Sequence, residues 1–151
     1  MITGQIVKGR DLPDKFKALA PKVNSGVQKA VESLAIKMTG NVKNKLSGDV
    51  LKVRTGNLRR SVHYEKEFGQ NKAFAIVGTN VIYARIHEYG GTIVPKTAKA
   101  LKFKIGDRWV ITKKVTIPER SFLRTALKEL VPEIKATLEK AVGDELKGLH
   151  R

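Results

Sequence analysis

Cysteine is absent from the 151-residue chain. Without it the chain can have no disulfide scaffold, thiol nucleophile or cysteine zinc site, and a reducing cytoplasm would suit it. Long apolar runs are absent too, since none approaches the roughly 20 residues of a membrane span. The N-terminus also lacks the apolar core of a signal peptide. These absences predict a soluble protein with no membrane partner.

Acidic residues are scarce, because 14 Asp and Glu face 30 Lys and Arg, which gives a formal net charge of +16. The basic excess is spread along the whole chain. A folded body this basic is expected to bind polyanions and to resist self-association. The 41% apolar content includes 3 Tyr; without them and with the 13 Gly the fraction is about 48%, which is ordinary for a globular protein and excludes a disordered chain. The length predicts a single domain over residues 1–151.

Helical periodicity marks the first third of the chain. Apolar residues recur every three or four positions over 12–46, which predicts one buried stripe. Pro21 suits the first turn of a helix. We therefore expect a short helix over roughly 13–20, a long one over 21–46 and a stop at Ser47-Gly48.

The last third repeats this pattern. An apolar stripe predicts a long helix over about 121–146. Pro132 lies inside it and removes a backbone donor, so we expect a kink or a split there.

The middle of the chain has strand character. A short helix over about 81–89 should interrupt the strands and end at Gly90-Gly91. The expected strands cover residues 61–67, 73–78, about 100–104, about 109–112 and 115–117. Strands bracketed by long helices indicate an α+β fold, with an antiparallel sheet of four to five strands covered by the two helices.

Catalytic constellations are poor. His63, His87 and His150 do not stand at metal-ligand spacing. His87-Glu88 superficially resembles the start of a zinc-protease motif, but no second His follows. No glycine-rich phosphate loop occurs. We expect no enzyme, cofactor or metal; a hydrolase using His87 and Glu88 is the remaining catalytic alternative.

Binding chemistry is richer in the segment 54–61. Arg54, Arg59 and Arg60 surround a Thr-Gly-Asn turn, and arginine forks bind phosphates and carboxylates bidentately. Gly56 can supply unusual backbone angles there. The alternative is a solvated basic turn whose Leu58 anchors into the core.

A second basic run decorates the strands after residue 95. It consists of Lys96, Lys99, Lys102, Lys104, Arg108, Lys113 and Lys114. Nucleic-acid readers usually place aromatic residues between such charges, and here Trp109 stands alone at the hairpin tip. A basic nucleic-acid-binding domain, associated with ribosome or nucleoid, is therefore the alternative function that the net charge leaves open.

Four segments come in one order along the chain. They are RTGNLRRS at 54–61, VGTN at 77–80, YARIHEYGG at 83–91 and IPERSFLR at 117–124. Together they resemble the tail-completion and virion-morphogenesis proteins of tailed double-stranded DNA bacteriophages. The resemblance runs from the long N-terminal helix to the C-terminal helix. One departure is Ser121, where many relatives carry a second Pro.

The resemblance implies a non-enzymatic virion protein that is present in the host cytoplasm before assembly. It implies a ring subunit in tail completion or head–tail joining. Its implied partners are the tail terminator, a head-completion or connector protein, the tail tube and the DNA in the channel. We expect the isolated chain to be only weakly oligomeric because of its charge.

Contact residues are expected in the loops 47–60 and 90–99, because loops carry function on rigid scaffolds. The best candidates for partner or DNA contact are Arg54, Arg59, Arg60, Lys96 and Lys99. Other motif residues are expected to be structural, with turns at the glycines, Pro118 ending the sheet and Phe122-Leu123 docking the last helix. These structural residues are Gly56, Leu58, Gly78, Tyr83, Gly90, Gly91, Pro118, Phe122 and Leu123.

Overall fold

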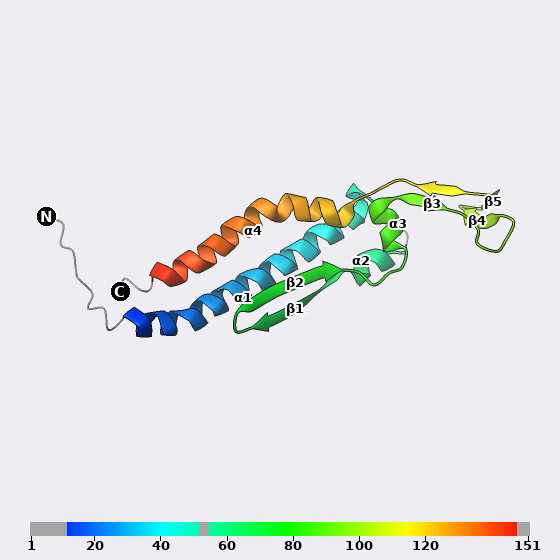
Figure 1. Ribbon diagram of the computed structural model, residues 1–151. Coiled ribbons are helices and arrows are strands. Elements are labelled where there is room, and N and C mark those ends of the chain that lie inside the picture. Colours follow the sequence, from blue (N-terminus) through cyan, green and yellow to red (C-terminus); the bar gives the residue numbers. More distant parts are fainter. Residues whose placement is uncertain (1–11, 52–54, 148–151) are drawn as a thin grey trace. The chain divides into compact units, whose positions relative to one another are not determined.

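A computed structural model describes residues 12–51 and 55–147, and the chain is α+β (Figure 1). The elements in order are α1 (Leu12–Asn44), the π-helical turn η1 (Lys45–Asp49), α2 (Asn57–Ser61), β1 (His63–Gly69), β2 (Lys72–Gly78), α3 (Ala84–Tyr89), β3 (Gly91–Ile93), β4 (Leu101–Ile105), β5 (Arg108–Thr112), β6 (Val115–Ile117) and α4 (Phe122–Lys147). The described residues form two compact units. The first unit contains 12–40, 63–77 and 129–147, and the second contains 41–51, 55–62 and 78–128.

The first unit is built on two long antiparallel helices (Figure 1). A Cβ added at Gly26 of α1 would lie 3.4 Å from the carbonyl oxygen of Ala141 in α4, so the helices approach closely there. Nearer the other end, Lys37 of α1 pairs with Glu133 of α4 at 2.5 Å. The buried residues of this unit are Leu19, Ala30, Leu34, Ala35 and Met38 of α1 and Leu130 of α4, and all but Ala35 belong to the two predicted apolar stripes.

Helix α1 is one element and not the two that the sequence suggested. Pro21 lies inside it. The lost hydrogen bond would have reached the carbonyl of Lys17, whose residue is exposed, so water can take its place. The helix ends at Asn44, and Gly48 in the following turn has a φ of 136°, which matches the predicted stop.

Helix α4 is also continuous, with Pro132 inside it, so the proline does not split the helix. In the described ranges, no helix combines the length and apolar character that crossing a membrane requires.

The β1–β2 hairpin is attached to α1 by polar contacts. Side-chain amides of Asn24 and Gln28 donate to the Gly69 carbonyl at 2.9 and 3.0 Å. Lys66 of β1 pairs with Glu32 of α1. The connection between the strands is Gln70-Asn71, so the hairpin predicted from 61–78 is confirmed with β1 starting two residues later.

The second unit gathers the shorter elements around a small core. Its buried apolar residues are Val42, Leu46, Val62, Ala84, Phe122 and Ala126. Ser61, at the end of α2, shares a 2.6 Å hydrogen bond with Thr79, just after β2. This bond fixes α2 beside the chain that leads into α3.

The predicted four-to-five-stranded sheet is wrong. The strands form three separate two-stranded sheets, β1–β2, β3–β6 and β4–β5. The pairs β3–β6 and β4–β5 are antiparallel. Strand β3 was not predicted, since its three residues, Gly91 to Ile93, are too few to show alternation. β6 is equally short and is followed by Pro118, which has no N–H to extend a ladder.

Candidate functional site

Helix α3 has a buried face and an exposed face. Ala84 and Glu88 are one turn apart and only 6% and 3% exposed. Ile82, just before the helix, is 96% exposed and Tyr89 is 58% exposed. A carboxylate this deep must be hydrogen-bonded, because burying it unpaired is very costly.

Glu88 finds its partners at the start of α4. Its two carboxylate oxygens accept the backbone N–H groups of Leu123 and Arg124 at 2.8 and 2.9 Å. These are among the first N–H groups of a helix, which have no partner inside it. The carboxylate also lies at the positive end of the helix dipole. Glu88 therefore caps α4 from a different element.

Backbone groups join the same two helices. The N–H of Arg120 donates to the His87 carbonyl at 2.8 Å, and that of Ser121 donates to the Glu88 carbonyl at 3.1 Å. Ser121 has a φ of 39°. Proline, with φ fixed near −65° and no N–H, could neither adopt this angle nor make this bond. The departure at Ser121 thus matches the local backbone of this chain.

Two glycines let the chains meet closely. Gly90 ends α3 with a φ of 68°, and an added Cβ would stand 2.7 Å from the backbone nitrogen of Glu119. Gly91 has a φ of 148°, a backbone angle that other residues rarely adopt, and an added Cβ would stand 2.9 Å from Cδ1 of Ile86. The predicted requirement for glycine is confirmed at both positions. It is wrong at Gly78, which ends β2 without a positive φ and where a Cβ would meet nothing within 4 Å.

Arg124 ties together the groups around this cap. Its guanidinium binds the Glu88 carboxylate at 3.2 Å and the Glu119 carboxylate at 2.6 Å. It also lies 4.5 Å from the centre of the Tyr89 ring. Half of its side chain is exposed. The pair of motifs at 83–91 and 117–124 therefore forms one structural joint.

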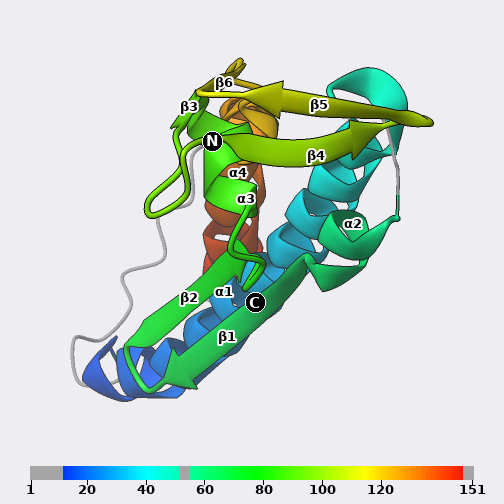
Figure 2. The ribbon, with the colours of Figure 1, turned by 90° about the vertical axis from the view of Figure 1, so that its right-hand side faces the viewer.

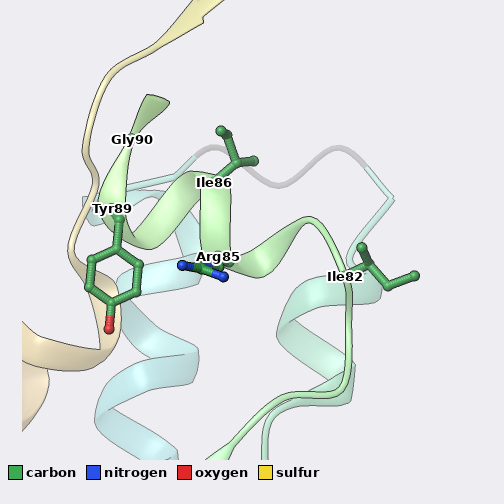
Figure 3. Close-up of a pocket in the computed structure, with 5 residues that line it drawn as sticks. All are labelled: Ile82, Arg85, Ile86, Tyr89 and Gly90. Carbon is green, nitrogen blue, oxygen red and sulfur yellow. The ribbon is translucent and has the colours of Figure 1, made fainter. Parts of the chain in front are cut away.

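The exposed face of α3 is the hollowed part of this joint. Ile82, Arg85, Ile86, Tyr89 and Gly90 line a shallow open pocket along it (Figure 3). Most of these side chains are apolar, and Arg85 brings one positive charge. Exposed apolar side chains grouped beside a charged one can serve as a binding surface.

His87 packs against an aromatic ring beside α3. Its ring meets Tyr83 edge-on at 6.0 Å. Burial, and secondly the positive charge of Arg120, lower the pKa of His87. Both oxygens of Glu88 accept backbone N–H groups at the start of α4. Within residues 12–51 and 55–147, no cluster of three or more His, Asp or Glu is suited to a metal ion.

The predicted contact residues lie in the second unit. Arg59 and Arg60 are exposed on α2, and Arg60 donates to the Asn57 side chain at 2.5 Å. Lys96 and Lys99 are exposed between β3 and β4. Figures 1 and 2 draw these two segments apart, so the fold does not merge them into one patch. Arg54 and His150 lie outside the described residues.

The turn before α2 follows the predicted logic. Gly56 precedes α2 with a φ of 71°. The Thr55 hydroxyl accepts the Asn57 N–H at 3.4 Å. Leu58 is half-buried, as expected for an anchor.

The docking residues differ in depth. Phe122 is fully buried, Leu123 is half-buried and Pro118 is exposed. Pro118 directly follows β6, as predicted. Tyr83 stands just before α3 and is 45% exposed, so its contribution to the core is partial.

Sequence reasoning missed the cap made by Glu88. The local signal was the start of α4, where the first turn contains no acidic residue. A helix without its own first-turn carboxylate can take one from elsewhere, but nothing in the sequence identifies the donor.

The chain matches a protein-family model. The family model described as the phage virion morphogenesis family matches residues 28–147, about four fifths of the chain. Neither curated proteins nor solved structures gave a match. The matched span includes the whole joint between α3 and α4.

Proposed function

We propose, from the premise that this chain belongs to the phage virion morphogenesis family, that it is a ring subunit in tail completion or head–tail joining. In this role it is structural and not catalytic. Its partners are other virion proteins: neighbouring copies, the tail terminator, a head-completion or connector protein, or the tail tube.

The observation that carries this proposal is the exposed apolar face of α3. Ile82 leaves 96% of its surface in water and Tyr89 leaves 58%. Glu88 and Gly90 hold this face in a fixed place by their contacts with 117–124. A rigid, exposed apolar surface favours assembly with another protein.

Charge supplies the second part of the proposal. Arg59 and Lys96 are exposed and make no ion pair within 4.0 Å in the portion of the chain that the structure describes. Arg60 is hydrogen-bonded only locally. With a net charge of +16, a ring of such subunits needs acidic neighbours or DNA to offset its self-repulsion.

The net charge also supports a second candidate, a nucleic-acid-binding protein. Binding of that kind would weaken steeply with salt, by roughly 10³- to 10⁵-fold between 50 and 200 mM for six to ten phosphate contacts. A salt titration of the purified chain with duplex DNA measures this directly.

The deciding experiment complements a phage that lacks this gene. Arg59→Glu with Arg60→Glu should leave the chain folded but reduce infectious particles by at least about tenfold, because reversed charges repel an acidic partner. The matched control is Lys17→Glu with Lys140→Glu, two exposed lysines of the first unit. A normal yield of infectious particles from the Arg variant would show that these arginines belong to a solvated turn with no partner contact.

Two further readouts test the role itself. Electron microscopy of the defective particles should show heads and tails that fail to join, or unfinished tails. Wild-type chain that is missing from purified virions would contradict the proposal.

A further inference from the structure

The β4–β5 hairpin presents a mixed face of four residues. Its register pairs Lys102 with Ile111 and Lys104 with Trp109. Side chains alternate between the faces of a strand, so these four lie together on one face. We call it the Lys-Trp face. Figure 2 shows the hairpin as a two-stranded ribbon, and the described strands add no third member to it.

The apolar half of the Lys-Trp face is open to water. Trp109 is 63% exposed and Ile111 is 68% exposed. The opposite face is different, since Phe103 and Val110, a cross-strand pair, are half-buried there. The hairpin therefore has one partly buried side, on which Ile105 is still 53% exposed, and one exposed side that carries Trp109.

The charged half is basic. Lys102 holds its ammonium group 4.8 Å from the centre of the Trp109 ring. The ammonium group of Lys104 lies 3.6 Å from the carboxylate of Asp107, which is exposed. Lys102, Lys113 and Lys114 make no ion pair within 4.0 Å among the residues described. Of the two lysines on this face, Lys102 lies against the exposed tryptophan without an acidic partner in the described part of the chain, and Lys104 has only the exposed Asp107.

We infer that the Lys-Trp face docks an acidic surface of another virion protein, with Trp109 as its anchor. The inference rests on the proposed assembly function and names its partner surface. Tryptophan is enriched among residues that dominate binding energy, and it supplies apolar area with a ring that a lysine can cover. Carboxylates on the partner would face Lys102 and Lys104.

A protein fits this face better than duplex DNA does. Phosphates would satisfy the lysines, but Ile111 and Trp109 need apolar contact, which a duplex offers only at its thymine methyl groups or by costly unstacking of a base step. A protein surface can offer carboxylates beside apolar groups, as interfaces commonly do. A second copy of this chain is a poor match because both faces would be basic.

The first experiment uses the complemented phage. Trp109→Ala with Ile111→Ser should lower the amount of chain in purified particles by at least about tenfold, since anchor residues dominate affinity. The matched control is Ile76→Ser, on β2 of the first unit, whose side chain is 61% exposed. Circular dichroism tests whether each variant is folded. A second variant, Lys102→Glu, should also lower the amount of chain in purified particles.

The second experiment identifies the occupant. A photo-crosslinking residue at position 109, compared with one at position 76, is activated during assembly. A crosslink from 109 to an acidic segment of a different virion protein supports the inference. Crosslinks to DNA or to a second copy of this chain overturn it.

The two proposals fail in different ways. If wild-type chain enters particles and the Trp109 and Lys102 variants enter equally well, the docking surface is wrong and the assembly role stands. If wild-type chain never enters particles, the assembly role is wrong and the docking surface falls with it.

Discussion

The two units of the molecule bury different kinds of side chain. In the first unit, the buried side chains among the described residues are all apolar, and Lys37–Glu133 lies near the surface. In the second unit, the carboxylate of Glu88 is 3% exposed. Apolar burial is non-directional, whereas a buried carboxylate requires each donor in place. The second unit should therefore be the more sensitive to single-atom changes.

The largest effects should come from the cores, where the units are alike. Phe122→Ala in the second unit should lower the free energy of unfolding by about 3–5 kcal/mol, and Leu34→Ala in the first by about 2–5 kcal/mol. Phe122 is fully buried and Leu34 is 8% exposed. Urea unfolding measures both. Leu127→Ala, at a 47% exposed position of α4, is the control and should change stability by less than about 0.5 kcal/mol.

Glu88→Ala should show how strongly the second unit depends on its buried carboxylate. It leaves the N–H groups of Leu123 and Arg124 without their acceptors, which costs about 1–3 kcal/mol. Hydrogen exchange should accelerate at these two amides. Glu88→Gln keeps the volume and one acceptor oxygen, so its loss should be smaller. Unchanged exchange at Leu123 in the Ala variant would remove the basis of the comparison.

The surface pair of the first unit should contribute less. Lys37→Ala removes an ion pair whose side chains are 51% and 44% exposed. Such pairs contribute about 0.2–1 kcal/mol, and added salt should reduce the difference between variant and wild type. A loss as large as that of Glu88→Ala would show that the first unit also depends on polar contacts.

The smallest effect concerns pH and belongs to the second unit. Burial and Arg120 lower the pKa of His87 below its ordinary 6.5. The unfolded chain therefore binds a proton more readily, and stability should fall as the pH drops below about 6.5. Comparing wild type with His87→Gln between pH 8 and 5 isolates this contribution. If wild type and His87→Gln lose the same amount of stability between pH 8 and pH 5, His87 does not contribute to the pH dependence.

The sequence predicted elements better than it predicted their pairing. The stripes of α1 and α4 and the alternation of β4 and β5 are local patterns, and the structure confirms them within a few residues. The pairing of β3 with β6 joins Gly91 to Ile117, and no local pattern selects that edge. The expected sheet failed for this reason.

The site shows the same limit. Gly90 and Gly91 were predicted to matter because glycine permits the tight turn that ends the helix over 81–89. Glu88 was considered only as part of a catalytic alternative. Its contact with Leu123 spans 35 positions, and helix-capping rules search only within a turn of the helix start. At the N-cap position itself, where those rules apply, the chain has Ser121, with a φ of 39°.

The two backbone hydrogen bonds at residues 120 and 121 have a consequence for how this chain can vary. They join the two ends of the segment 89–119, so that this segment forms a long loop anchored at His87 and Glu88. The entropy of closing such a segment rises by only about 0.6 kcal/mol for each doubling of its length. Insertions or deletions at the hairpin tip, Gly106-Asp107, would leave α3 and α4 joined as before. The length of the β4–β5 hairpin can therefore change in evolution without disturbing the joint between α3 and α4.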